Sequence, residues 1–201
     1  MQLILKRIFD ILFSLIIILI LSPVLLTITI LIKITSKGPI LFKQERVGQY
    51  NELFKIYKFR SMIQNAEKLG SGYYMDGEDD PRITRVGKIL RKTSLDELPE
   101  LFNVLKGEMS LAGPRPTLKY QVDKYSEFQK KRLEYPPGIT GWAQINGRNE
   151  IPWSKRIELD IWYIDNYSFL LDIKILLLTL PRVLSSRGIS HNQSEKDVDD
   201  L

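Results

Sequence analysis

The sequence lacks cysteine altogether and contains a single histidine, His191, near its C-terminus. The absence of cysteine excludes disulfide bonds, thiolate zinc sites and a cysteine nucleophile, and it is consistent with a reducing compartment. One histidine in a polar tail argues against histidine general-base chemistry and His-rich metal sites. Any catalysis is therefore expected to use carboxylates, lysine, arginine, hydroxyl groups or a metal ion. At 201 residues, the chain is long enough to bury a core.

Acidic residues are scarce in the first 60 residues, where nine lysines and arginines stand against three acids. This basic segment surrounds an apolar one, a pattern that points first to anionic lipid headgroups and only second to nucleic acid. No arginine-rich, zinc-finger or RNA-binding pattern supports the second option. We therefore expect anionic membrane lipids as partners and no nucleic acid.

Charged residues are also missing from residues 11–32, an apolar run close to the roughly 20 residues that a straight helix needs to cross a bilayer. Ser22 and Pro23 lie in the middle of this run, where proline removes a helical hydrogen bond and kinks the helix. Basic residues flank both ends, and the positive-inside rule places both flanks in the cytoplasm. A re-entrant helix that enters and leaves by one face satisfies both observations. An ordinary kinked span is the alternative that this pattern leaves open.

Short apolar-polar alternations follow the apolar run. Residues 40–47 and 53–60 are predicted to form a β-hairpin. This interpretation places Lys55, Lys58 and Arg60 on one face of the second strand. They form there either a solvated surface beside lipid headgroups or part of a phosphate site.

Residues 64–81 are rich in glycine and acidic side chains and are predicted to form an exposed loop. The acidic run at residues 76–80 is expected to be solvated, since the spacing of a calcium-binding loop is absent. Residues 86–92 then form a short amphipathic segment whose basic face, which includes Arg91, leads into the next motif.

Two adjacent carboxylates, Asp96 and Glu97, mark residues 93–116, TSLDELPELFNVLKGEMSLAGPRP. Ser94 and Glu97 match the spacing of a capping box, in which Glu97 would only satisfy backbone donors. Because proline is favoured at the first helical position, a helix at residues 99–106 is the competing interpretation.

An ionised aspartate just ahead of a helix N-terminus can act on a phosphate in two ways. It can attack phosphorus to form an acyl phosphate, or it can hold Mg²⁺ that neutralises phosphate oxygens. Adjacent side chains point in different directions, so the pair is expected to divide these roles. Composition and spacing leave the choice open.

Arg115 lies between two prolines and follows Gly113, which permits close backbone approach. A guanidinium held in this way suits bidentate phosphate recognition, whereas an arginine on a stiff turn is the plainer alternative. Residues 135–150 form a glycine-rich loop that contains Arg148 and either cradles a nucleotide or rests at a membrane interface.

The C-terminal half is predicted to contain three helices, at residues 120–132, 151–168 and 169–184. The last is too short and too interrupted to span a membrane and is expected to be a core or interfacial helix. The polar tail at residues 185–201 is expected to be disordered.

Taken together, these segments resemble the monotopic phosphoglycosyl transferases, which are bacterial sugar transferases, and especially the small PglC-like members. The likeness rests on KRIFDI at residues 6–11, Ser22-Pro23, KFRSM at residues 58–62, residues 87–116 and PGITGWAQINGR at residues 137–148. As a set these motifs are highly specific, although each alone would be weak.

The resemblance implies an α+β, mainly helical fold. It implies a re-entrant membrane helix at residues 1–35 and a catalytic sugar transferase domain, with a β-hairpin and a compact helical body, at residues 36–184. It also implies a location at the bacterial inner membrane, with the catalytic body on the cytosolic face.

The resemblance further implies a Mg²⁺-dependent, two-step transfer of sugar-1-phosphate from a UDP-sugar to a polyprenyl phosphate, as the first membrane step of glycoconjugate assembly. Asp96 would attack the β-phosphate, release UMP, carry the covalent sugar-phosphate and contact Mg²⁺. Glu97 would assist as a base or in positioning. Substrate binding would fall to four basic residues, with the first and last assigned more weakly: Lys58, Arg91, Arg115 and Arg148.

A non-catalytic membrane scaffold whose basic face binds anionic lipid is the competing class. A glycosidase is disfavoured because adjacent carboxylates do not readily straddle a scissile bond. Neither the sugar nor the oligomeric state follows from the sequence.

Overall fold

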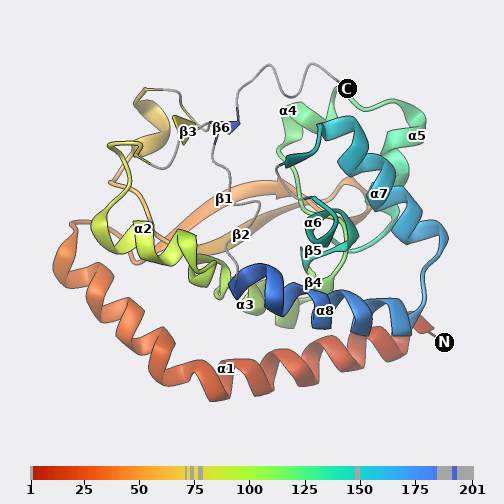
Figure 1. The fold of residues 1–201 in the computed structure, drawn as a ribbon, viewed down its shortest axis with the longest axis horizontal. Coiled ribbons are helices and arrows are strands. Elements are labelled where there is room, and N and C mark those ends of the chain that lie inside the picture. The colour runs from red at the N-terminus through yellow and green to blue at the C-terminus, as the bar shows by residue number, and fades with distance from the viewer. Residues whose placement is uncertain are drawn as a thin grey trace.

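The computed structural model describes residues 2–70, 72, 75–76, 79–147, 150–184 and 192–193. Helices predominate, and the strands of this part of the chain form three two-stranded sheets (Figure 1). The helices are α1 Gln2–Thr35, α2 Arg85–Lys92, α3 Glu100–Lys106, α4 Lys119–Val122, α5 Glu127–Lys130, α6 Trp142–Ile145, α7 Trp153–Asp165 and α8 Phe169–Leu184. The strands are β1 Leu41–Val47, β2 Leu53–Phe59, β3 Met75–Asp76, β4 Ser110–Ala112, β5 Gly138–Thr140 and β6 Asn192–Gln193. The predicted α+β, mainly helical class is confirmed.

The long helix α1 is bent into two arms beneath the rest of the protein, and Pro23 lies inside it (Figure 1). Proline has no N–H, so Pro23 cannot donate to the carbonyl of Leu19, four residues earlier. The hydroxyl of Ser22 donates to that carbonyl at 2.8 Å and supplies the missing hydrogen bond. The Ser-Pro pair therefore allows a bend in an apolar helix without leaving a backbone acceptor unsatisfied.

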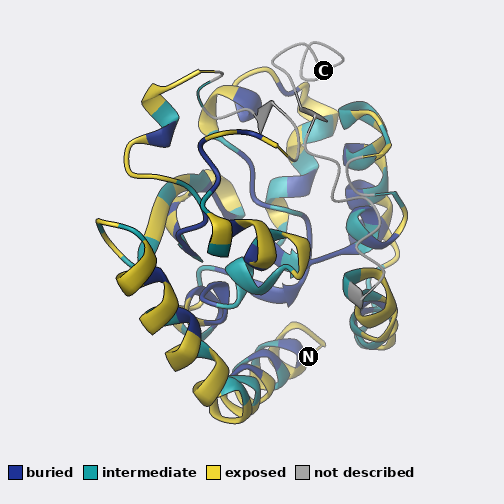
Figure 2. Ribbon diagram, turned by 60° about the vertical axis from the view of Figure 1, so that its left-hand side comes forward, coloured by how far each residue is buried: buried dark blue, intermediate teal, exposed yellow. Residues whose placement is uncertain are grey.

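The outer side of α1 is exposed (Figure 2), and many of its exposed side chains are large and apolar. Leu19 and Ile34 are 76% and 72% exposed. Among the described residues, α1 is the one helix long and apolar enough to cross a membrane, and only 11% of its most apolar window is buried inside the protein. An apolar surface of this extent is typical of a membrane-embedded segment.

The N-terminal arm of α1 is fixed to the body by a buried polar network. Lys6 Nζ donates to Asp172 Oδ2 on α8 at 2.7 Å and to the carbonyl of Ala112 at 2.8 Å. Asp10 accepts hydrogen bonds from Ser110 Oγ at 2.7 Å and from a backbone N–H of β4. Charged groups in the motif at residues 6–11 thus join α1 to β4 and α8.

The C-terminal arm of α1 packs against a different part of the same body. Ile28 and Ile32 are buried with Phe59 of β2 and Leu90 of α2. One folded body thus contacts both arms of α1. This arrangement favours the re-entrant helix over the straight span.

The hairpin forms where it was predicted, with β1 antiparallel to β2. Lys58 lies opposite Phe42, whereas Lys55 lies opposite Glu45. The prediction that Lys55 shares a face with Lys58 and Arg60 is wrong, because side chains alternate along a strand with a period of two. Lys58 faces the interior, and Lys55 is exposed.

Helix α3 lies along the free edge of β2. The side chain of Asn103, which is fully buried, accepts from the Tyr57 N–H at 3.0 Å and donates to the Lys55 carbonyl at 2.8 Å. An edge strand normally leaves such groups open, and Asn103 closes this edge. The core between helix and strands contains Phe54, Ile56, Leu101, Val104, Met109 and Leu111.

The predicted loop at residues 135–150 contains regular structure that its glycines concealed. β5 runs parallel to β4, with Ser110 opposite Gly138, and α6 follows it. A Cβ atom at Gly138 would lie 2.1 Å from the backbone nitrogen of Gly113. The glycines therefore permit close strand contact at this position rather than marking only a flexible loop.

The helix predicted at residues 120–132 is divided into α4, α5 and a 3₁₀ turn. Ser126 accepts from the Gln129 N–H, and the Gln129 side chain accepts in return from the Ser126 N–H. This capping box starts a second helix within the predicted one. α7 and α8 form close to the ranges predicted for the last two helices.

The acidic loop at residues 64–81 is only partly solvated. Asp79 is exposed as expected, but Asp80 is buried and pairs with Arg82 at 2.6 Å, contrary to the prediction for the acidic run. Arg82 also donates to three loop carbonyls, those of Ala66, Leu69 and Gly72. The pair organises the loop because a buried carboxylate requires a charged partner.

The C-terminal tail was predicted to be disordered, yet Asn192–Gln193 form β6, which pairs antiparallel with β3. The prediction is wrong for these two residues. The rest of the tail at residues 185–191 and 194–201, with His191, lies outside the described residues.

The bent helix predicts that both ends of α1 are accessible from one side of the membrane. Gln2 and Lys37 are exposed, so cysteines introduced singly at these positions in the cysteine-free chain should react with an impermeant maleimide from the same side of intact vesicles. Labelling from opposite sides would restore the straight span.

The buried Lys6–Asp172 pair predicts strong coupling between α1 and α8. Lys6→Met should lower the free energy of unfolding in detergent by about 3–5 kcal/mol, because it leaves a buried charge without its partner. A double-mutant cycle with Asp172→Asn should show a large interaction energy. The exposed pair Lys155–Glu158 is the control and should couple by less than about 1 kcal/mol. Equal coupling energies for the two pairs would contradict this account.

Candidate active site

The two adjacent carboxylates lie on a tight turn before α3. Ser94 adopts a left-handed backbone conformation with φ of 56°, a 3₁₀ turn follows at Leu95–Glu97, and α3 begins directly after Pro99. The Ser94 side chain caps no backbone group. The capping-box interpretation is therefore excluded, and the helix start at the proline is confirmed within one residue.

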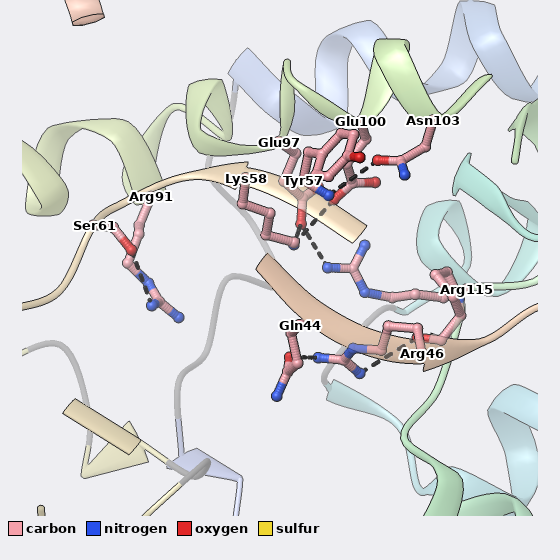
Figure 3. A network of polar contacts seen from close by, with 11 residues as sticks. Gln44, Arg46, Tyr57, Lys58, Ser61, Arg91, Glu97, Glu100, Asn103 and Arg115 are labelled. Carbon is pink, nitrogen blue, oxygen red and sulfur yellow. Dashed lines mark hydrogen bonds and ion pairs between the residues drawn. The ribbon is translucent and has the colours of Figure 1, made fainter. Parts of the chain in front are cut away.

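Glu97 binds two cations through one oxygen atom (Figure 3). Its Oε1 accepts from Lys58 Nζ of β2 at 2.6 Å and from Arg115 Nη2 at 2.5 Å. The Glu97 and Lys58 side chains are 13% and 16% exposed, so water screens this cluster only weakly. The structure thus brings together three of the residues predicted from the sequence.

Glu100 is a third carboxylate of this cluster that the sequence reasoning missed. It is fully buried, and its Oε1 lies 3.1 Å from Lys58 Nζ. Its pKa is raised to about 7, because burial, together with the Glu97 charge, outweighs the opposing charge of Lys58. The signal was its position three residues after Glu97, a spacing that places two side chains on one face of a helical segment.

Asp96 is the carboxylate left available at the centre of these charges. It forms no hydrogen bond or ion pair with any residue that the structure describes. The pKa of Asp96 is raised, first by burial and then by the Glu97 charge, and three cations oppose this shift without cancelling it: Lys58, Arg91 and Arg115. The cations favour the ionised form that a nucleophile or a metal ligand requires.

Arg91 approaches the carboxylates from α2. A Cβ atom at Gly87 would lie 1.8 Å from the Ser61 carbonyl oxygen, so only glycine allows α2 to lie this close to the segment after β2. One turn later, Arg91 donates to Ser61 Oγ at 3.5 Å. Burial lowers its pKa, and the charges of Asp96 and Glu97 raise it, which places Arg91 within electrostatic reach of both.

The backbone of Arg115 is held by a buried arginine, Arg132. Arg132 donates to the Arg115 carbonyl at 3.0 Å, and Arg132 itself pairs with Asp160 of α7 and with the Tyr125 hydroxyl. The Glu97 charge raises the pKa of Arg115, which stays protonated. Arg115 is thus held at its backbone by Arg132 and at its guanidinium by Glu97.

A further arginine, Arg46 of β1, lies beside Arg115 and was not predicted as a site residue (Figure 3). The strand register could have found it. Arg46 lies opposite Phe54, and Lys58 lies opposite Phe42, which puts Arg46 and Lys58 on one face of the hairpin. The predicted site residue Arg148 lies outside the described residues.

The described residues contain no group of three or more histidine, cysteine or acidic side chains placed to hold a metal ion. Mg²⁺ is nevertheless commonly bound by one or two carboxylates together with substrate phosphates and water. Asp96, whose carboxylate has no protein partner in this part of the chain, fits that mode of binding. Glu97 fits it less well, because its Oε1 already accepts from two cations.

A bent apolar helix and a carboxylate surrounded by cations are the arrangement expected of a membrane protein that acts on anionic ligands. A sequence profile described as bacterial sugar transferase matches residues 1–186. The chain belongs to this family, which confirms the resemblance inferred from the motifs.

Several named proteins are similar to this chain in sequence. The chain is 47% identical over 186 residues to an uncharacterized sugar transferase, EpsL, of Bacillus subtilis, covering 92% of this chain and 90% of that protein. It is 46% identical to a UDP-N-acetylgalactosamine-undecaprenyl-phosphate N-acetylgalactosaminephosphotransferase of Aeromonas hydrophila, covering 91% and 44%. It is 41% identical to an undecaprenyl-phosphate galactose phosphotransferase of Salmonella typhimurium, covering 92% and 41%. The chain thus spans less than half the length of the last two proteins.

The buried carboxylate of Glu100 predicts a specific dependence of stability on pH. Its folded pKa of about 7 lies above the ordinary value of 4.5, so the folded state holds this proton more tightly than the unfolded state does. The contribution of Glu100 to stability is therefore greatest below pH 4.5 and falls as pH rises to about 7, by at most about 3 kcal/mol.

Glu100→Gln should remove this dependence. The melting temperature of the wild-type protein, relative to that of the variant, should decline between pH 5 and 7 and then level off. Glu52→Gln, at an exposed glutamate of the hairpin turn, is the control and should show no such trend. A wild-type advantage that grows with pH would contradict the assignment.

Proposed function

We propose that this protein transfers sugar-1-phosphate from a UDP-sugar to a polyprenyl phosphate through a covalent intermediate on Asp96, with release of UMP. One observation carries the proposal. Asp96 has no hydrogen-bonding partner among the described residues, although Lys58, Arg91 and Arg115 act on it electrostatically. Its neighbour Glu97 accepts from two of these cations instead. The result is one available carboxylate beside several donors suited to phosphate.

The printed names of the relatives support the substrates. Relatives from Aeromonas hydrophila and Salmonella typhimurium are named as sugar phosphotransferases that act on undecaprenyl phosphate. Another, from Klebsiella pneumoniae, is named as a UDP-glucose:undecaprenyl-phosphate glucose-1-phosphate transferase and is 45% identical over 185 residues. Their sugars differ, so the donor is proposed here only as a UDP-sugar.

In the first step, a carboxylate oxygen of Asp96 attacks the β-phosphorus of the UDP-sugar. The bond from that phosphorus to the oxygen bridging the two phosphates breaks, and its electron pair leaves with UMP. The sugar-phosphate remains on Asp96 as an acyl phosphate. Arg91 and Arg115 bind phosphate oxygens, and Glu97 keeps Lys58 and Arg115 in position by ion pairing.

In the second step, a phosphate oxygen of the polyprenyl phosphate attacks the same phosphorus. The acyl phosphate bond breaks, the Asp96 carboxylate is restored, and the sugar leaves on a polyprenyl diphosphate. Because the lipid phosphate attacks phosphorus and not the acyl carbon, Asp96 is regenerated without a water molecule. The membrane-embedded α1 supports this step, because it holds the body at the surface where a lipid phosphate is presented.

Mg²⁺ is proposed as the cofactor. Asp96 would hold it together with phosphate oxygens of the substrate. When bound, the ion neutralises charge on those oxygens. A further positive charge suits this site. It contains three carboxylates, Asp96, Glu97 and Glu100, and substrate phosphates would add more negative charge to the site.

The proposed location is the bacterial inner membrane, with the body on the cytosolic face. The first observation in support is that both arms of α1 contact one body. The second is the basic character of residues 1–60, which suits anionic lipid headgroups. A UDP-sugar donor would also be drawn from the cytosol.

The covalent route predicts turnover of donor without acceptor. Purified protein with Mg²⁺ and a panel of UDP-sugars, in the absence of polyprenyl phosphate, should release up to one equivalent of UMP with the cognate sugar. Asp96→Asn should abolish this burst, because an amide is a poor nucleophile toward phosphorus. Asp79→Asn, at an exposed aspartate, is the matched control and should retain it.

Two outcomes would refute the proposal. One is an undiminished UMP burst in Asp96→Asn, which would remove Asp96 as the nucleophile. The other is the absence of UMP release with every donor in both the presence and the absence of acceptor. The second outcome, combined with vesicle binding that follows the anionic lipid content, would support the scaffold alternative.

A further inference from the structure

Arg46 is a half-buried cation at the site for which the reaction as described gives no task. Its Nη2 donates to Gln44 Oε1 at 2.5 Å, and its Nη1 reaches the Pro116 carbonyl at 3.5 Å. Both acceptors are uncharged. Its Nε is buried without a hydrogen-bonding partner, and Arg46 forms no ion pair with any carboxylate in the described part of the chain.

The neighbour of Arg46 is a second guanidinium. The side chains of Arg46 and Arg115 lie next to each other; the Arg115 guanidinium points toward Glu97, and the Arg46 guanidinium points toward Gln44 (Figure 3). Burial and, next, the charge of Arg115 lower the pKa of Arg46 to about 10, although nearby acids oppose the shift. Glu97 binds Arg115 directly but not Arg46. Among the described residues, a carboxylate thus contacts Arg115 but none contacts Arg46, so the charge of Arg46 is not neutralised by an ion pair.

Asp96 and Arg46 differ in the charged groups that act on them. The Asp96 charge acts on Arg91 and on Arg115. The principal charges on Arg46 are instead those of Arg115, Glu100, Tyr120 and Glu97. Arg115 is therefore within electrostatic reach of both Asp96 and Arg46.

The residues next to Arg46 belong to two core clusters, one of which includes residues of α1. The next residue, Val47, is buried in a cluster with Val122, Tyr125, Ile157 and Ile161, to which α1 contributes no residue. Phe54, the cross-strand partner of Arg46, packs instead in the cluster that includes Phe9, Ile17 and Ile18 of α1. Arg46 therefore lies between the part of the core that contacts α1 and the part that does not.

We propose that Arg46, together with Arg115, binds the nucleotide phosphate of the UDP-sugar, the phosphate that departs with UMP. This assignment rests on the proposed function and extends it. Negative charge develops on the bridging oxygen as its bond to the β-phosphorus breaks, and a guanidinium fork next to Arg115 can donate to that phosphate. Binding would also relieve the repulsion between the two arginines.

The test compares Arg46→Gln with Lys43→Gln, which removes a charge from the opposite, exposed face of the same strand. Wild type and variants are assayed in detergent with Mg²⁺, the cognate UDP-sugar and polyprenyl phosphate, and UMP is titrated as a product inhibitor. Arg46→Gln should weaken UMP inhibition by about 10- to 100-fold, the effect expected for a hydrogen bond between charged groups. The KM for polyprenyl phosphate should stay within about twofold.

Two further measurements separate a binding role from a structural one. Arg46→Lys keeps the charge without the planar fork and should recover part of the UMP affinity, while melting temperatures show whether each variant is folded. Lys43→Gln should leave both UMP inhibition and the KM for polyprenyl phosphate unchanged.

The inference is overturned if folded Arg46→Gln or Arg46→Lys shows wild-type UMP inhibition. It is also overturned if only the KM for polyprenyl phosphate rises, which would assign Arg46 to the lipid phosphate. A wild-type protein that releases no UMP would instead refute the proposed function itself, so the two failures are distinguishable.

Discussion

The site depends on one carboxylate oxygen, Glu97 Oε1, which accepts from Lys58 and Arg115 at the same time. Lys58 comes from the hairpin, and Arg115 comes from the turn after β4, so this oxygen joins two separate parts of the body. Because the Glu97 side chain is largely buried, loss of either cation would leave a poorly solvated charge, which is costly. By holding both cations, Glu97 leaves Asp96 as the carboxylate without a protein partner in the described part of the chain. Adjacent residues thereby take different tasks.

The rest of the fold brings the partners of Glu97 to it. Asn103 fastens α3 to the edge of β2, which sets the start of the helix over Lys58. Arg132 fixes the backbone of Arg115, and its own charge is balanced by Asp160. Lys6 and Asp10 then tie the membrane helix to β4 and α8, on the other side of the same core. Buried polar side chains that hydrogen-bond from one element to another set the relative positions of these elements, a role that apolar packing alone performs less specifically.

Much of the local structure could be predicted from the sequence, because its signals are local. The apolar run, the Ser-Pro break, the hairpin and the helix start at Pro99 all follow from periodicity and from proline chemistry. The parallel pairing of β4 with β5 could not be predicted, since it joins short segments far apart in the chain and its glycines mimic a loop. Glu100 and Asp80 were missed for a related reason. Their burial depends on Lys58 and Arg82 as partners, and pairing of this kind becomes visible only when the chain is folded.

The division of labour between Asp96 and Glu97 is the central claim, and peptide mapping by mass spectrometry tests it most directly. The protein is incubated with Mg²⁺ and its cognate UDP-sugar without acceptor, and fragmentation locates any added sugar-phosphate. The account predicts the adduct on Asp96 and its disappearance when polyprenyl phosphate is added. An adduct on Glu97, or stoichiometric UMP release with no adduct at any residue, would contradict it.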